Sequence, residues 1–130
     1  MRYIIDAYAW IDYLTGGRLG AKVRELILND DNELISLNIT IAEVISKIKR
    51  KNENIEIAYE CINSNSKIIN ITPEIAKKAG ILHAETREKI KNFGLVDAIM
   101  VITAREEKGK VLTGDHHLKN FKEAIFIEFK

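Results

Sequence analysis

The chain has 130 residues, of which 46% are hydrophobic and 30% are charged. This length allows one ordinary hydrophobic core but hardly two, and the composition excludes a disordered tail. The 20 Lys and Arg residues nearly cancel the 19 Asp and Glu residues, so the net charge of +1 predicts neither nucleic acid nor a membrane surface as a partner.

The single cysteine, Cys61, excludes an internal disulfide and fits a reducing compartment. The N-terminal residues do not resemble a signal peptide, and no apolar run is long enough to span a membrane. We therefore expect a cytoplasmic protein without a membrane partner, folded as one domain over residues 1–130.

Strands and helices alternate along the chain. In order, the pattern predicts a strand at 3–5, helices at 7–14 and 21–28, a strand at 34–37, helices at 40–50 and 55–62, a strand at 67–71, helices at 73–89 and 95–107, and strands at 110–113 and 124–129. Short apolar runs of this kind are typical of strands buried on both faces. The alternation predicts an α/β fold, a three-layer α/β/α sandwich around a mostly parallel five-stranded sheet.

Two acidic residues follow predicted strands. Asp6 comes directly after Tyr3-Ile4-Ile5, and Asp115 follows Val111-Leu112-Thr113-Gly114. Ligands of parallel α/β sheets bind at the carboxyl ends of the strands, where both acids are expected. Each also has a structural interpretation, because Asp6 suits a helix N-cap and Asp115 an ordinary turn.

Glu43 lies in the motif Thr40-Ile41-Ala42-Glu43, which has the spacing of a capping box. Considered alone, the motif favours a capping role for Glu43. Its position in a first helical turn after the second strand would nevertheless place it at the same edge of the sheet as Asp6.

Asp97 lies inside Leu95-Val96-Asp97-Ala98-Ile99, at the start of the most apolar predicted helix. The helix dipole stabilises an acid there by only about 0.3–1 kcal/mol, whereas burial of an unpaired charge costs much more. A bound cation or a cluster of hydrogen bonds explains this residue better than the helix dipole does, and a functional role is favoured.

Four carboxylates that converge on one rim repel one another unless a cation neutralises them. Ligand sets made only of oxygen atoms suit Mg²⁺ or Mn²⁺ rather than Zn²⁺. Metals held in this way support hydrolysis of phosphodiester bonds.

In their order and spacing, Asp6, Glu43, Asp97 and Asp115 resemble the acidic quartet of PIN-domain ribonucleases. The order and spacing of the acids and the length of the chain resemble those of VapC-type toxins of bacterial and archaeal toxin–antitoxin pairs, and the resemblance covers essentially the whole chain. The resemblance implies a Mg²⁺- or Mn²⁺-dependent endoribonuclease whose catalytic and metal-binding residues are these four acids, a homodimer, and an antitoxin partner that covers the site.

The sequence departs from the family pattern in two places and matches it in a third. Ala7, Tyr8 and Ala9 follow Asp6, where the family usually has Ser or Thr, and Tyr8 could supply a hydroxyl. Thr113 matches the usual hydroxyl before the fourth acid and is a candidate to position water or Asp115. An acid often found just beyond the fourth is replaced by His116-His117, which leaves a second metal position open. His117 could contact substrate, but the interpretation favoured from the sequence is a merely exposed loop residue.

Basic residues form two groups that could contact phosphates or simply face solvent. They are Lys47, Lys49, Arg50 and Lys51 after Glu43, and Lys119 and Lys122 after Asp115.

Two alternatives to a toxin ribonuclease stay within the same fold family. One is a degenerate PIN-like domain that binds RNA or a partner without cleavage, and the other is a housekeeping RNA-processing nuclease. Phosphatases of the haloacid type need an acid at position 8, where Tyr8 stands, and receiver domains need a pair of acids that Asp6-Ala7 does not offer.

Overall fold

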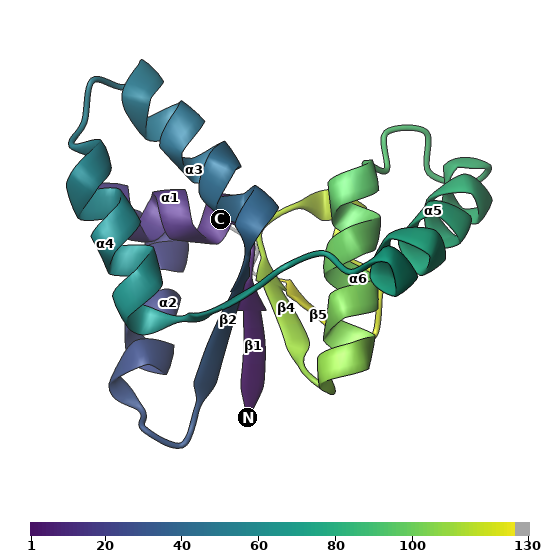
Figure 1. Cartoon of the computed structure of the whole chain (residues 1–130), viewed down its shortest axis with the longest axis horizontal. Coiled ribbons are helices and arrows are strands. Elements are labelled where there is room, and N and C mark those ends of the chain that lie inside the picture. The colour runs from purple at the N-terminus through teal and green to yellow at the C-terminus, as the bar shows by residue number, and fades with distance from the viewer. Residues whose placement is uncertain (127–130) are drawn as a thin grey trace.

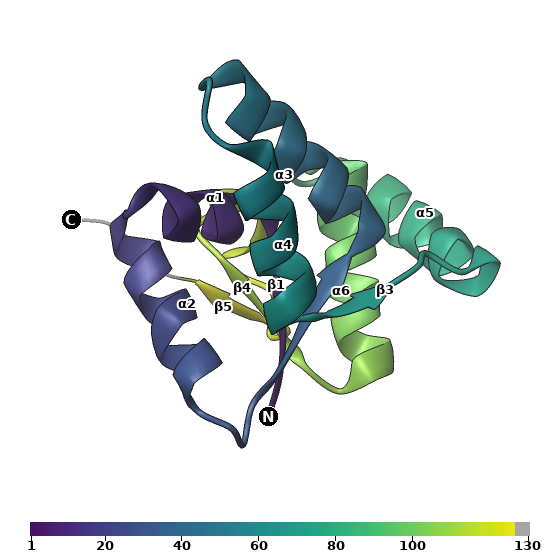
Figure 2. The ribbon, with the colours of Figure 1, turned by 60° about the vertical axis from the view of Figure 1, so that its left-hand side comes forward.

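The protein is described by a computed structural model of residues 1–126. Its central sheet has five described strands, all paired in parallel, in the order β3-β2-β1-β4-β5 (Figures 1 and 2). The strands are β1 (Arg2–Ile5), β2 (Glu33–Leu37), β3 (Lys67–Ile69), β4 (Lys110–Thr113) and β5 (Ala124–Phe126). The predicted parallel five-stranded sheet is confirmed, although residues 127–129 of the last predicted strand lie outside the described residues.

Helices cover both faces of the sheet, as Figure 1 shows. One layer consists of α1 (Ala7–Thr15), α2 (Arg18–Leu28), α3 (Asn38–Arg50) and α4 (Ile55–Asn65). The other consists of α5 (Pro73–Arg87) and α6 (Leu95–Glu107), and a short 3-10 helix, η1 (His116–Leu118), follows β4. The predicted three-layer α/β/α sandwich is therefore confirmed. Within residues 1–126, no helix combines the length and the apolar character needed to cross a bilayer.

The strands divide their side chains between two cores because successive residues of a strand point to opposite faces. Ile4 packs in the core beneath α5 and α6, together with its register neighbours Ile35 and Val111. Ile5 and its neighbour Leu112 pack in the core beneath α1–α4. Both faces are apolar, which is why these strands appear as continuous apolar runs in the sequence.

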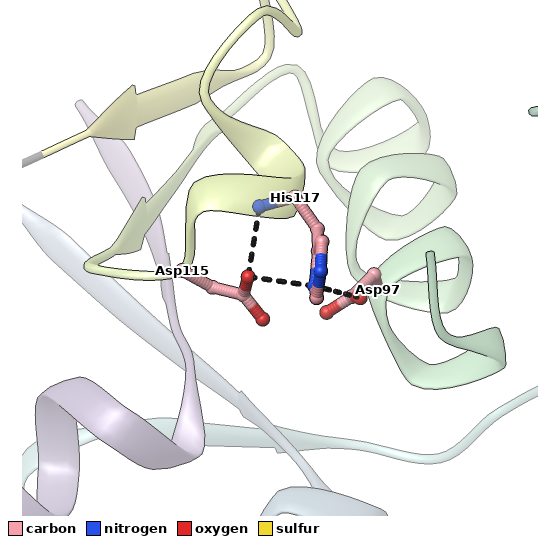
Figure 3. A group of neighbouring side chains, drawn as sticks. All are labelled: Asp97, Asp115 and His117. Carbon is pink, nitrogen blue, oxygen red and sulfur yellow. Dashed lines mark hydrogen bonds and ion pairs between the residues drawn. The ribbon is translucent and has the colours of Figure 1, made fainter. Parts of the chain in front are cut away.

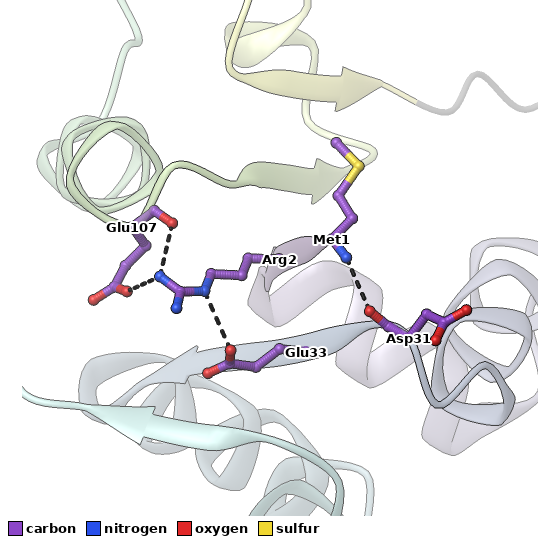
Figure 4. A network of polar contacts seen from close by, with 5 residues as sticks. All are labelled: Met1, Arg2, Asp31, Glu33 and Glu107. Carbon is purple, nitrogen blue, oxygen red and sulfur yellow. Dashed lines mark hydrogen bonds and ion pairs between the residues drawn. The ribbon is translucent and has the colours of Figure 1, made fainter.

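The amino edge of the sheet is tied together by Arg2 (Figure 4). Its guanidinium Nε lies 3.2 Å from Glu33 Oε2, and its Nη1 lies 3.3 Å from Glu107 Oε2. The terminal amine of Met1 donates to the carbonyl of Asp31 at 3.0 Å. These contacts are exposed and contribute little stability each, but they join β1, β2 and α6 at the end of the sheet opposite the acids.

A candidate metal centre at the carboxyl edge of the sheet

The strand order reverses at β1, so that β2 and β3 lie on one side of β1 and β4 and β5 lie on the other. The chain runs outward from β1 through β2 to β3, then returns to place β4 on the other side of β1. Ligands of open α/β sheets bind at such a switch point, outside the carboxyl ends of the strands. A pocket of about 450 Å³ lies there. It is lined by Asp6, Ala7, Tyr8, Glu43, Val96, Asp97, Met100, Gly114, Asp115, His116, His117 and Leu118.

Asp6 connects β1 to α1 and lines the pocket. Its Oδ1 accepts a hydrogen bond from the Ala9 N–H at 2.7 Å, so it is the N-cap of α1. The residue is only 8% exposed. The pKa of Asp6 is raised to about 7, mainly by burial and to a smaller extent by the charges of Asp115 and Asp97, while hydrogen bonds from Thr113 and Ala9 oppose the shift. The capping role and the position in the pocket belong to the same carboxylate.

Thr113 lies behind the acids rather than in the wall of the pocket. It is fully buried, and its Oγ1 accepts a hydrogen bond from the Asp115 N–H at 2.9 Å. The same side chain is hydrogen-bonded to Asp6. Thr113 therefore links the carboxylate at the end of β1 to the backbone that carries the carboxylate after β4.

Asp97 occupies the third position of α6. Its Oδ2 accepts a hydrogen bond from the Gly94 N–H at 2.9 Å, and its side chain is 19% exposed. Burial raises the pKa of Asp97, and the negative charge of Asp115 adds to this effect. Like Asp6, this residue satisfies a helix N-terminus and faces the pocket at the same time.

The capping box predicted at Thr40 and Glu43 is wrong. β2 continues into α3 without a loop, so the helix begins at Asn38, and Leu37 is its N-cap. Thr40 consequently lies inside the first turn with a buried hydroxyl that has no hydrogen-bond partner among the described residues. Glu43 falls in the second turn rather than the first and lines the pocket. Partial burial raises the pKa of the Glu43 carboxyl, as does the nearby charge of Asp97.

His117 is the pocket residue that was interpreted from the sequence as merely exposed. Its Nδ1 lies 3.0 Å from Asp115 Oδ1 and 3.9 Å from Asp97 Oδ2 (Figure 3). One ligand atom from each of these three residues lies within 4.8 Å of the others, a spacing that can hold a metal ion. The only sequence signal was the position of His117 two residues after an acid, which becomes informative once Asp115 Oδ1 accepts the His117 N–H at 2.8 Å.

The donors gathered in this pocket fit a divalent cation. Burial and mutual repulsion raise the pKa values of Asp6, Glu43 and Asp97, which means that the site disfavours several negative charges at once. A cation removes this penalty, because an opposite charge a few ångströms away favours the ionised form. Carboxylate oxygen atoms are the ligands that hard divalent ions select.

Comparison with known proteins agrees with this arrangement. A sequence model of the PIN domain matches residues 3–124. The chain belongs to the PIN domain family. No curated protein sequence matches the chain.

Solved structures show the same fold as this PIN domain. A toxin–antitoxin complex from Klebsiella pneumoniae is 25% identical, with 98% of this chain and 99% of that chain covered and a TM-score of 0.74. VapBC2 from Rickettsia felis, bound to a DNA fragment from its promoter, is 18% identical over the full length of both chains, with a TM-score of 0.76. Mycobacterium tuberculosis VapC20, described as a sarcin–ricin loop cleaving toxin, is 15% identical over 93% and 97% of the two chains, with a TM-score of 0.71.

The PIN domain places Tyr8 at the pocket, where the resemblance predicts a smaller hydroxyl residue. Tyr8 is 50% exposed and lies over Gly114, where an added Cβ would come 3.2 Å from the ring. The tyrosine therefore forms part of the pocket wall beside Asp115.

Proposed function

We propose that this PIN domain is a Mg²⁺- or Mn²⁺-dependent endoribonuclease that hydrolyses phosphodiester bonds, and that it is the toxin of a toxin–antitoxin pair. The observation that carries the proposal is the convergence of Asp6, Glu43, Asp97 and Asp115 on one pocket at the switch point of the sheet. Three of these carboxyl groups have raised pKa values, as expected for partly buried carboxylates that lie close together without a cation between them.

The acids have different parts in this proposal. Asp97 and Asp115 hold the ion directly, because their oxygen atoms lie within one metal-sized cluster. Asp6 and Glu43 complete the negative field of the pocket, and Thr113 positions Asp6 and Asp115 relative to each other. A divalent ion held by these residues would activate water and would neutralise the negative charge on the oxygen atoms of the scissile phosphate.

A basic groove next to the pocket provides a path for the substrate backbone. It shares Ala7 and Glu43 with the pocket and continues along α3 past Ser46 to Lys47 and Arg50. Neither cation forms an ion pair with a carboxylate within residues 1–126. Phosphate groups of a nucleic acid are the natural partners for such side chains. RNA as the substrate follows the activity stated for VapC20.

The biological setting is proposed from the structural relatives. The similar structures from K. pneumoniae and R. felis are toxin–antitoxin assemblies. We propose by analogy that residues 1–130 form a single cytoplasmic nuclease domain that acts as a homodimer and is silenced by a cognate antitoxin.

Asp97→Asn tests the catalytic proposal with little structural disturbance, because the amide oxygen can still accept the Gly94 N–H. Wild-type protein should cleave RNA in Mn²⁺ or Mg²⁺ but not in EDTA, and the metal should raise its melting temperature. The variant should lose cleavage and most of the metal-induced shift. Asp30→Asn, a neutralised acid in an exposed loop outside the pocket, is the matched control and should behave like the wild type.

The outcomes separate the alternatives. RNA binding without metal-dependent cleavage would instead support a degenerate PIN domain. Cleavage without growth arrest on expression would support a housekeeping nuclease.

A further inference from the structure

We propose that His117 is a nitrogen ligand of the metal in this pocket, and that the site therefore prefers Mn²⁺ over Mg²⁺. The inference rests on the metal centre of the proposed function but not on the substrate or the toxin role. It assigns a function to the position where the family often carries a further acid.

The spacing of the ligand atoms fits one shared ion. Neighbouring ligands in an octahedron with bonds of about 2.1 Å lie roughly 3 Å apart, and opposite ligands lie roughly 4 Å apart. His117 Nδ1 is 3.0 Å from Asp115 Oδ1 and 3.9 Å from Asp97 Oδ2. Figure 3 shows the imidazole between the two carboxylates. The distances from the imidazole nitrogen to the two carboxylates thus match those between neighbouring and between opposite ligands of one ion.

The local backbone holds the imidazole in this place. Asp115 Oδ1 accepts the backbone N–H of His117 at 2.8 Å and is the N-cap of η1. Leu118, the next residue, is buried in the core beneath α5 and α6. His117 is therefore anchored on both sides, while its half-exposed ring leaves room for water on the ion.

The position of the proton on the imidazole distinguishes a ligand from a positioning residue. If Nδ1 carries the proton, His117 donates to Asp115 and only orients that carboxylate. If Nε2 carries the proton, the lone pair of Nδ1 is available to the metal. Two carboxylates beside Nδ1 attract a cation to this point, and the cation selects the second tautomer.

Replacement of an oxygen ligand by nitrogen changes which ion the site prefers. Mg²⁺ requires hard oxygen ligands and loses its water reluctantly, whereas transition-metal ions accept imidazole. A site with two carboxylates and one imidazole therefore favours Mn²⁺, while a site with three carboxylates shows less discrimination.

The experiment measures metal binding in the whole protein without RNA. Calorimetric titration of the metal-free wild type should give at least tenfold tighter binding of Mn²⁺ than of Mg²⁺. His117→Ala should weaken Mn²⁺ binding about tenfold more than Mg²⁺ binding. His117→Asp, which places an acid at this position, should reduce the preference for Mn²⁺ over Mg²⁺. Circular dichroism checks that each variant is folded.

Pulsed EPR of the Mn²⁺-bound protein provides the direct readout. A ¹⁴N coupling typical of a bound imidazole should be present in the wild type and in His116→Ala and His83→Ala, and absent in His117→Ala. Mn²⁺ binding without that coupling, or loss of the coupling in His116→Ala instead, would overturn the assignment of His117 while the metal centre stands. Failure of Mn²⁺ to bind at all would overturn both this inference and the metal centre.

Discussion

Asp6 and Asp97 show how one carboxylate can serve both a helix and a site. Each accepts a backbone N–H at the start of a helix, and each lines the pocket. From the sequence, capping and ligand binding are alternatives for Asp6, yet in the structure the carboxylate that caps α1 also lines the pocket. The hydrogen bond to the helix start fixes the direction of the carboxylate, so the helix prepares the site before any ion binds.

At Glu43 the structure leaves no capping role that could account for the residue. Glu43→Gln should therefore not lower the stability of the metal-free protein, since the side chain makes no hydrogen bond with the described residues and its charge is repelled by Asp97. Removal of the charge should lower metal-dependent RNA cleavage by roughly 100-fold or more, the range typical of a lost acid–base or ligand group. Urea unfolding and cleavage rates measured on the same preparation provide the test. Retained cleavage would remove Glu43 from the mechanism.

Elements were predictable where an apolar or periodic pattern extended over several turns. α6 spans Leu95–Glu107, the range predicted from its pattern. α3 begins two residues before its predicted start because no polar loop separates it from β2. The predicted start was wrong because Thr40 and Glu43 have the spacing of a capping box without forming one. η1 was not predicted, since three residues are too few for a period to show. Because η1 was not predicted, the contact between His117 and Asp115 was not predicted either, since only this turn brings the two side chains together.

The groove along α3 gives a prediction about substrate binding. Replacement of both Lys47 and Arg50 by Ala should weaken RNA binding about tenfold, which corresponds to about 1.4 kcal/mol. The dependence of log K on log salt should become shallower by about 1.4 if two phosphate contacts to a single strand are lost. Metal binding should not change.

Lys49→Ala is the matched control for the groove, because Lys49 is exposed on the same helix but does not line it. Equal loss of affinity in the control and in the double variant would indicate a general charge effect rather than a groove. The comparison should use the catalytically inactive Asp97→Asn background so that RNA stays intact.

At the scale of the whole molecule, strand order determines which acids meet. Alternation of helices and strands was sufficient to predict a parallel sheet and a common carboxyl edge. The order β3-β2-β1-β4-β5, which makes β1 the neighbour of both β2 and β4, depends on long-range pairing that local patterns do not encode. Asp6 and Asp115 are close because β1 and β4 are neighbours, and Glu43 joins them because β2 flanks β1. The distances among the acids therefore had to come from the structure.

Clustering of the acids makes the stability of the metal-free protein dependent on pH. The pKa of Asp6 is raised from 3.8 to about 7, so the folded state binds more protons than the unfolded state between about pH 4 and pH 7. The free energy of unfolding should consequently fall as the pH rises through this window, by a few kcal/mol at about 1.4 kcal/mol per pKa unit. The raised pKa values of Glu43 and Asp97 act in the same direction.

Asp6→Asn should flatten this pH dependence, because the amide oxygen preserves the hydrogen bond to Ala9 and removes the titration. Urea unfolding in EDTA from pH 4 to pH 8 checks the slope for wild type and variant. Parallel curves would show that Asp6 is not the titrating group.

A crystal of the protein grown with Mn²⁺ tests the central claim, a metal centre at the carboxyl edge of the sheet, most directly. An anomalous difference map should contain a peak about 2.2 Å from carboxylate oxygen atoms of both Asp97 and Asp115, between the ends of β1 and β4. The same map calculated for Asp97→Asn crystals should lose that peak. An empty pocket in the wild type at saturating Mn²⁺, or an ion bound only elsewhere on the molecule, would contradict the account.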